Sequence, residues 1–315
     1  MRKKKYFSRT VIFIVCALLA LIFLLPTLLT ISNSFMTQTE ISANYGVIFQ
    51  NASGSGGKTY VSEKVNLKFI PDKVSLEQYI TVLLKSPDYL LKFWNSVILV
   101  VPIVVFQVAI ASIAAYGFTR WRGKVRAAIF FFYVILMLMP YQVTLVPNYL
   151  VSKWLHILDT RWAIILPGVF APFSVFLLTK FMRRIPYSLI EAAKIDGAGE
   201  WRTMFQIVLP MSVPMIATLA LLIGLSYWND WKNGLYYLTK SELFSIQNIL
   251  NRMLQDVQFL KSGAGGSNAS EIAATLPSTG IKMAIAVVGA LPVMIIYPFF
   301  QKFFVKGITI GAVKG

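Results

Sequence analysis

Long apolar runs alternate with short polar segments along most of this chain. Six of these runs are each about 18 to 25 residues long, the length that an α-helix needs to cross the core of a bilayer. They comprise residues 11–31, 93–117, 127–147, 162–179, 208–227 and 283–300. The pattern predicts an all-α, polytopic membrane protein with six transmembrane helices.

The first apolar run follows a basic tail, residues 1–10, and in this respect imitates a secretory signal. The apolar core of a signal has about 7 to 15 residues and precedes a cleavage site of small residues. This run is longer, and no clear site of that kind follows it. We therefore interpret it as an uncleaved first transmembrane helix.

Lysine and arginine predict the orientation, because they are enriched in cytoplasmic loops. With a cytoplasmic N-terminus, the segments on the inside hold 17 of the 30 basic residues, and the other 13 are spread over about twice that length. The expected topology is N-in and C-in, with residues 180–207 in the cytoplasm. Three parts follow: residues 1–31, a basic tail and first helix; residues 32–92, an extracytoplasmic loop with an amphipathic segment at 76–84; and residues 93–315, a core domain of five helices.

The polar segment between Glu191 and Pro210 has its own helix signals. Proline is tolerated in a first turn, so a helix is expected from Pro186 through the good helix formers at 191–194. Gly197 supplies the turned backbone that ends it, and a second short helix is expected from about Glu200. Two rigid helices between membrane spans are suited to transmit a mechanical movement to those spans. An ordinary cytoplasmic loop is the alternative interpretation, since it has the same pattern.

The composition agrees with a membrane protein. Hydrophobic residues make up 57% of the chain and charged residues 14%, whereas soluble domains carry roughly 25% charged residues. The net charge of +17 lies in short loops beside apolar runs, which favours membrane topology and contact with membrane lipid over nucleic-acid binding. With Cys16 as the one cysteine and His156 as the one histidine, we expect no disulfide, no metal site and no catalytic residues.

The predicted spans lack Asp, Glu, Lys, Arg and His in their interiors. Ion-coupled transporters usually need such a group within the membrane, so proton coupling is disfavoured, while sodium held by backbone carbonyls stays open. Each span instead contains proline, which removes a backbone hydrogen bond and kinks a helix. Kinked, uncharged spans suit a polar but neutral passage that changes shape under an external energy source.

Residues 52–59 nearly form a phosphate-binding loop, with Ala52 in place of its first glycine. Such a loop follows a buried strand and opens a helix, and neither is expected here. A flexible exposed linker is the preferred interpretation.

Aromatic and polar side chains meet at the outer end of the fifth predicted span. Aromatic faces can stack on a sugar ring, and amides or carboxylates can bind its hydroxyls. An interfacial aromatic belt is the alternative. The candidate residues of a substrate pathway are Gln142, Asn148, Tyr227, Trp228, Asn229, Asp230 and Trp231.

The spacing of one motif adds a resemblance to a known family. Glu191-Ala192-Ala193, three residues, Gly197, nine residues and then Ile-Val-Leu-Pro at 207–210 resemble the EAA motif of permease subunits of bacterial ABC importers. Further matching segments are Asn95-Ser96, Ala115-Tyr116-Gly117, Met139-Pro140, Ile185-Pro186, Trp228-Asn229-Asp230, and the stretches 297–307 and 311–315. Together they are similar to the maltose-type carbohydrate permeases, and above all to the subgroup linked with complex oligosaccharides and polysaccharides.

The resemblance implies a fold, partners and roles. It implies a multi-pass subunit of the bacterial cytoplasmic membrane that works with a homologous second permease, two copies of a cytoplasmic ABC ATPase and an extracytoplasmic sugar-binding protein. This chain would bind no cofactor, and ATP and Mg²⁺ would bind in the partner ATPase. The residues implied in coupling to that ATPase are Glu191, Ala192, Ala193, Asp196, Gly197 and Ala198.

The same resemblance suggests how the segment would meet the ATPase. The apolar side chains of Leu189, Ala192, Ala193 and Ile195 would fill a groove on the ATPase. Many relatives carry acidic residues just before the motif glutamate, where this chain has Ser188, Leu189 and Ile190. This departure leaves the affinity for the ATPase, or the choice of ATPase, open.

Other functions stay open at this point. A secondary sugar transporter would be driven by an ion gradient without an ATPase, and an ABC permease could carry a solute other than a sugar. A membrane enzyme or sensor is a further class, but an enzyme needs converging acid, base or metal groups, and none is visible in the sequence.

Overall fold

A computed structural model describes residues 2–50, 66–121, 123–261 and 276–312 of the 315-residue chain. These residues are mainly helical, with one isolated antiparallel bridge between Met36 and Val74. The segment that resembles a phosphate-binding loop, residues 52–59, lies outside the described residues. The chain divides into two compact units, Met1–Leu90 with Ile249–Leu291, and Leu91–Asn248 with Pro292–Gly315.

The first unit contains the N-terminal helix and the elements of the first long loop. Its helices are α1 (Arg2–Asn33), α2 (Gln38–Gln50), α3 (Glu77–Ile80), the π-helical turn η1 (Thr81–Lys85), most of α13 (Ile246–Lys261) and the start of α15 (Thr279–Ala312). The expected amphipathic segment at 76–84 forms α3 and η1, where Gln78 and Val82 are buried. The Gln78 Nε2 group donates to the Met36 carbonyl at 2.5 Å. The span Arg9–Asn33 within α1 is long and apolar enough to cross a membrane.

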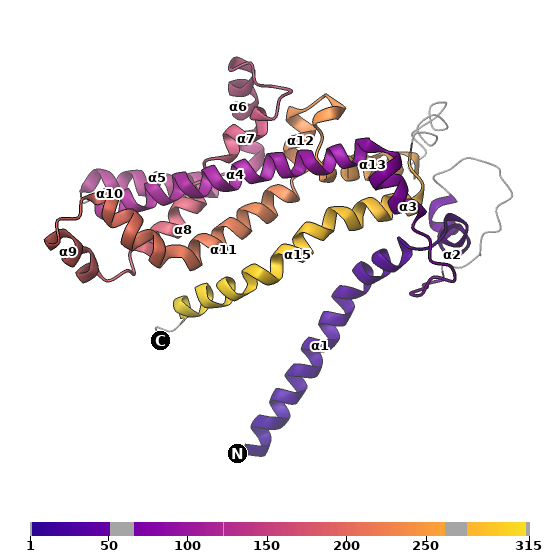
Figure 1. Ribbon diagram of the computed structural model, residues 1–315, viewed down its shortest axis with the longest axis horizontal. Coiled ribbons are helices and arrows are strands. Elements are labelled where there is room, and N and C mark those ends of the chain that lie inside the picture. The colour runs from indigo at the N-terminus through magenta and orange to yellow at the C-terminus, as the bar shows by residue number, and fades with distance from the viewer. Residues whose placement is uncertain (1, 51–65, 122, 262–275, 313–315) are drawn as a thin grey trace. The chain divides into compact units, whose positions relative to one another are not determined.

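The second unit contains the remaining helices (Figure 1). They are α4 (Pro87–Arg120), α5 (Lys124–Leu138), α6 (Tyr141–Trp154), α7 (Trp162–Gly168), α8 (Pro172–Met182), α9 (Tyr187–Ile195), α10 (Glu200–Thr203), the π-helical turn η2 (Met204–Val208), α11 (Leu209–Trp228), α12 (Lys232–Tyr237) and the 3-10 turn η3 (Ser241–Leu243). The expected helices from Pro186 and from about Glu200 are confirmed as α9 and α10.

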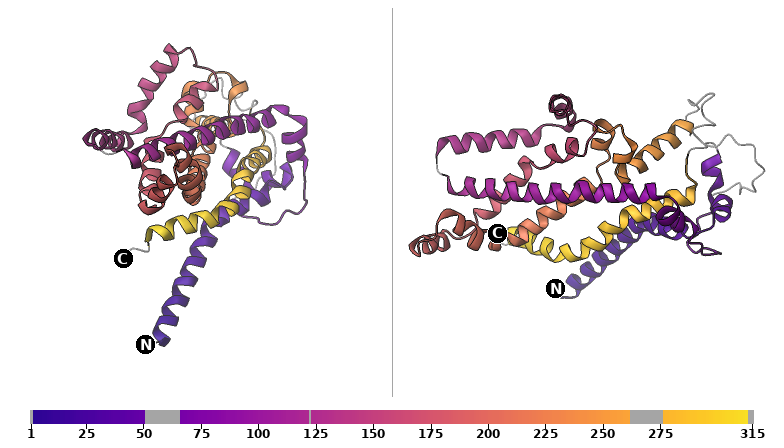
Figure 2. Two further views of the ribbon diagram at one scale, coloured as in Figure 1. Left: turned by 60° about the vertical axis from the view of Figure 1, so that its left-hand side comes forward. Right: turned by 45° about the horizontal axis from the view of Figure 1, so that its top comes forward.

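The core of the second unit joins α4, α8 and α11. Ile103, Val175, Leu178 and Leu219 are at most 1% exposed and belong to one packed cluster. Lipid tails are as apolar as these side chains, so close packing contributes more here than transfer out of water. Figure 2 (right) shows α5 running alongside α4, where Phe118 packs edge-on against two aromatic rings of α5.

The third predicted span, residues 127–147, is not one continuous helix. This region is two helices, α5 and α6, with a bend of 103° between them, and the pair can count as one broken span. Pro140 disfavours helical backbone at the residue before it, and Met139 is extended, with φ −70° and ψ 124°. The apolar run continues through the bend, so hydropathy by itself does not reveal the break.

Among the described residues, five helical segments are long and apolar enough to span a membrane. The number becomes six if the bent pair α5–α6 is counted as one span. One of the five is the span Trp162–Met182, which contains both α7 and α8. Its break precedes Pro172, and Ala171 is extended with φ −135° and ψ 123°. Proline therefore interrupts two of the spans rather than only bending them.

Candidate functional site

A Schellman motif ends α9 within residues 180–207, which we call the coupling loop after the role that the resemblance implies. Gly197 has φ +78°, a left-handed conformation that favours glycine. Its N–H donates to the Lys194 carbonyl at 3.0 Å, and the Ala198 N–H donates to the Ala193 carbonyl at 2.8 Å. These two bonds satisfy carbonyls that the end of the helix would leave unpaired. A Cβ atom at position 197 would meet no atom within 4 Å, so glycine is required here by backbone conformation and not by packing.

The two faces of α9 have different surroundings. Ile190 and Ala193 are each 7% exposed and pack towards their own chain. Glu191, Ala192, Asp196 and Gly197 are exposed, Ala198 is partly exposed, Leu189 is 42% exposed and Ile195 is 85% exposed. The expectation that Ala193 would fill a groove on a partner does not fit this burial. The surface open to a partner is formed by Leu189, Glu191, Ala192, Ile195 and the turn at 196–198.

A polar network that the sequence did not reveal joins this loop to the end of α4. The Glu200 carboxylate accepts hydrogen bonds from the Tyr116 hydroxyl at 2.5 Å and from the Arg120 Nε at 3.2 Å. Its other oxygen lies 2.9 Å from the Lys194 Nζ. Tyr116 and Arg120 are 84 and 80 residues away from Glu200 in the chain, so no local pattern predicts the contact.

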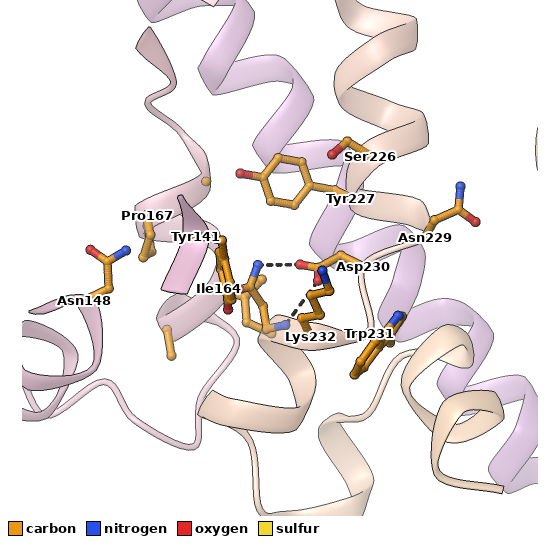
Figure 3. A pocket seen from close by; sticks show the side chains of 13 residues that line it. Tyr141, Asn148, Ile164, Pro167, Ser226, Tyr227, Asn229, Asp230, Trp231 and Lys232 are labelled. Carbon is orange, nitrogen blue, oxygen red and sulfur yellow. Dashed lines mark hydrogen bonds between the residues drawn. The ribbon is translucent and has the colours of Figure 1, made fainter. Parts of the chain in front are cut away.

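A cavity of about 460 Å³ opens beside the C-terminal end of α11 (Figure 3). Elements α6, α7, α11 and α12 supply its walls. The lining residues are Tyr141, Asn148, Ala163, Ile164, Pro167, Gly168, Ser226, Tyr227, Asn229, Asp230, Trp231, Lys232 and Asn233. Three aromatic rings, three side-chain amides, one carboxylate and one ammonium group therefore lie around one space.

Hydrogen bonds hold several of these groups in place. The Tyr141 hydroxyl donates to the Asn233 Oδ1 at 2.9 Å. Asn233 in turn donates its backbone N–H to the Asp230 Oδ1 at 3.1 Å and its side-chain amide to the Asp230 Oδ2. Polar groups fixed in this way lose little rotamer freedom when a ligand binds.

Five of the seven predicted pathway residues line the cavity: Asn148, Tyr227, Asn229, Asp230 and Trp231. The Asn229 side chain points away from the other lining residues in Figure 3 and donates to the Leu225 carbonyl at 2.9 Å. Gln142 is exposed and does not line the cavity.

Trp228, also predicted for the pathway, does not line this cavity. Its side chain is 7% exposed and packs edge-on against Phe93, with ring centroids 5.7 Å apart. It lines an apolar groove of about 330 Å³ together with residues of α4 and α15. Adjacent residues of an α-helix point about 100° apart, so Tyr227 and Trp228 face different surroundings.

A clasp between two loops positions the cavity walls. The Asp159 Oδ1 accepts backbone N–H groups of Thr239 and Lys240 at 2.8 and 3.0 Å, and its Oδ2 accepts the Thr239 hydroxyl at 2.8 Å. These bonds hold the pKa of the Asp159 carboxyl below its ordinary value, with the Lys240 N–H as the largest cause. Asp159 precedes α7 and Thr239 follows α12, so the clasp ties together two elements that line the cavity.

No group of three or more His, Cys, Asp or Glu side chains suited to a metal ion occurs among the residues that the structure describes. The arrangement offers an exposed loop surface and a cavity lined by hydrogen-bonding and aromatic groups.

Comparison with known proteins relates most of the chain to transporters. Residues 107–310 match the family described as "Binding-protein-dependent transport system inner membrane component". The chain is 37% identical over 260 residues to the polygalacturonan/rhamnogalacturonan transport system permease protein YtcP of Bacillus subtilis (strain 168), covering 81% of this chain and 88% of that protein. It is 28% identical to the arabinooligosaccharides transport system permease protein AraQ of Halalkalibacterium halodurans, covering 95% and 94% of the two chains.

A solved structure shows the same fold. A chain from the crystal structure of a bacterial ABC transporter involved in the import of the acidic polysaccharide alginate matches with a TM-score of 0.73. The match covers 96% of this chain and 98% of that chain, at 23% sequence identity. The arrangement of helices described above is therefore that of an ABC importer permease.

Proposed function

Since the chain belongs to the family of binding-protein-dependent transport system inner membrane components, we propose that it carries an oligosaccharide or polysaccharide fragment through the cytoplasmic membrane. As a member of this family it is a multi-pass permease subunit of an ABC transporter, and ATP is hydrolysed by a separate subunit. The observation that carries the proposal is the 37% identity to a polygalacturonan and rhamnogalacturonan permease over most of both chains.

The chemistry of the cavity supports a sugar as the substrate. Its volume, about 460 Å³, lies within the range of roughly 300–1,000 Å³ that is usual for sites of small ligands. The rings of Tyr141, Tyr227 and Trp231 offer faces for the C–H surface of a sugar. Amide and carboxylate groups beside them, fixed by the Asp230–Asn233 bonds, can pair with hydroxyls in both donor and acceptor roles.

The coupling loop is the proposed contact for the ATPase. Its exposed surface combines an apolar knob, Ile195, with the charged groups of Glu191 and Asp196. The apolar side chain would enter a groove, and the carboxylates would pair with basic groups or helix N-termini of the ATPase. Gly197 and Ala198 would keep the turn in shape while the loop is pushed.

The remaining partners follow from the same proposal. A binding protein would deliver the sugar on the outer side, and a homologous permease would form the other half of the passage. Two ATPase copies would bind ATP and Mg²⁺ on the inner side, and this chain itself would bind no cofactor. With N-in and C-in topology, the coupling loop lies on the side of the ATP.

ATP-dependent uptake in proteoliposomes tests this function. The complete transporter, with its binding protein, would be reconstituted with ATP inside and fluorescent oligogalacturonides, arabino-oligosaccharides or a peptide of similar size outside. We expect uptake of a saccharide that requires both ATP and the binding protein. Uptake driven by an ion gradient without ATP would instead support a secondary transporter, and uptake of the peptide in place of every saccharide would refute the sugar assignment.

A further inference from the structure

The Glu200 carboxylate joins three helices at the coupling loop. Glu200 begins α10 and binds Lys194 of α9 with one oxygen, at 2.9 Å. With its other oxygen it accepts from Tyr116 at 2.5 Å and from Arg120 at 3.2 Å, both on α4. One side chain therefore connects the loop helix, the helix after it and the end of α4.

Burial makes this contact more than a surface ion pair. Exposed ion pairs contribute little individually, and the side chains of Glu200 and Lys194 are 51% and 46% exposed. Tyr116, however, is 7% exposed, and the Arg120 side chain is 15% exposed. The Arg120 guanidinium also lies over the Tyr187 ring of α9, 5.5 Å from its centroid. Loss of the carboxylate would leave a largely buried hydroxyl without the acceptor described here, which is unfavourable.

Two helices, α4 and α11, contact both the coupling loop and the region of the cavity, but they are attached to the loop in different ways. The chain runs from α10 through η2 directly into α11, so a movement of the loop reaches α11 through covalent bonds. Helix α4 does not continue from the loop in this way. Apolar side chains of α4 share a packed cluster with Met204 and Val208 of η2, and the polar link between α4 and the segment that follows α9 is the contact to Glu200.

Helix α4 also extends from this contact to the wall of the cavity. It is one helix from Pro87 to Arg120, and Tyr116 lies thirteen residues from Ile103, which is about 20 Å at 1.5 Å per residue. Ile103 is fully buried against Gly168, where a Cβ atom would lie 3.1 Å from the Ile103 Cδ1. Gly168 lines the cavity, so a shift of α4 along its axis changes the cavity wall.

We propose that Glu200 is the positioning residue that makes α4 follow the coupling loop, so that α4 and α11 move together when the ATPase pushes the loop. The proposal rests on the coupling role proposed above for residues 191–198. It assigns the transfer of movement to α4 to Glu200, which lies in the nine-residue spacer of the EAA pattern and is not one of the residues that the pattern specifies.

The test compares sugar transported per ATP hydrolysed in the complete transporter reconstituted with its binding protein. The variants are Glu200→Ala, Tyr116→Phe and the double variant. The matched control is Arg202→Gln, which also removes one charge from this segment but contacts Gln206 of the adjoining turn, at 2.9 Å, rather than α4. Copurification of the ATPase is measured for each variant, because it reports on the coupling loop itself.

We expect Glu200→Ala to lower the ratio of sugar to ATP about fivefold or more, the lower end of the usual range for coupling between sites. The ATPase should still copurify at the wild-type level, and Arg202→Gln should keep the wild-type ratio. Since Tyr116 acts through the same carboxylate, the double variant should lose no more than Glu200→Ala does. Should Glu200→Ala fail to insert, Tyr116→Phe, which removes a single hydroxyl, must lower the ratio in the same direction.

A wild-type ratio in Glu200→Ala, or losses that multiply in the double variant, would overturn the role of Glu200 while the transport function stands. A wild-type transporter without ATP-dependent sugar uptake would instead refute the proposed function, and the role of Glu200 with it.

Discussion

Replacing Gly197 with alanine perturbs the coupling loop at one backbone position without adding a clash. The left-handed conformation costs an L-residue about 1–2 kcal/mol more than glycine. No atom lies within 4 Å of the new Cβ, so the whole cost comes from the backbone. A change of this size lowers the population of the intact turn by a factor of about 5 to 30.

Hydrogen–deuterium exchange measures this population directly. The reporting amides are those of Gly197 and Ala198, which donate to Lys194 and Ala193 at 3.0 and 2.8 Å. Gly199→Ala is the matched control, because Gly199 is also exposed and without near neighbours, but has an ordinary φ of −68°. Gly197→Asn should fall between wild type and alanine, since asparagine tolerates the left-handed region.

We expect Gly197→Ala to lower protection of both amides about 5- to 30-fold and to reduce sugar uptake more than ATP hydrolysis. Gly199→Ala should leave both properties unchanged. Equal protection in the two alanine variants would refute the argument from backbone conformation. Reduced protection with unchanged uptake would refute the role of the turn in coupling.

Three further predictions concern the exposed surface of the coupling loop, the cavity and the Asp159 contact. Ile195→Ser removes the apolar side chain that is 85% exposed, and we expect weaker copurification of the ATPase with unchanged thermal stability of the solubilised permease. Tyr227→Phe removes a hydroxyl beside the cavity and should lower sugar-stimulated ATP hydrolysis more than basal hydrolysis, whereas Trp228→Ala, at a packed position, should mainly lower the melting temperature. Asp159→Asn should lower the melting temperature at neutral pH. This difference in melting temperature should shrink as the pH falls below 3.8, the ordinary pKa of the carboxyl. The reason is that a carboxyl whose pKa is lowered in the folded state stabilises the fold above its ordinary pKa and loses this effect as it is protonated.

Each of these predictions has a result that contradicts it. Wild-type copurification of Ile195→Ser would exclude this side chain from the ATPase contact. Equal loss of basal and stimulated hydrolysis in Tyr227→Phe would favour a structural role for its hydroxyl. A difference in melting temperature for Asp159→Asn that stays constant or grows on acidification would show that ionisation of Asp159 does not stabilise the clasp.

The coupling loop could be predicted from the sequence because its signals are local. Pro186 starts α9, Gly197 ends it, and both act on backbone conformation within a few residues. The long spans were predictable for a similar reason, since apolar length is sufficient to recognise them. The sharp break at Met139 could not be predicted in the same way, because the apolar run continues across it. Proline does not mark such a break reliably, since it is also found within continuous helices such as α4.

The parts of the site that were missed depend on contacts across the fold. Trp228 lies beside four polar or aromatic pathway residues in sequence, but the neighbours of α11 decide which way it faces. The partners of Glu200 on α4 lie 80 and 84 residues away in the chain. Ala193 is likewise buried because it packs against the rest of the chain, and helix propensity carries no information about such packing.

Photo-cross-linking at position 195 tests the central claim most directly. A photoreactive amino acid in place of Ile195 would be activated in membranes that hold the complete transporter, with the buried position of Ile190 as the control. We predict an adduct between position 195 and the ATPase subunit, and adducts within its own chain from position 190. Adducts of position 195 with lipid or with its own chain, and none with the ATPase, would contradict the claim that this loop receives the movement of the ATPase.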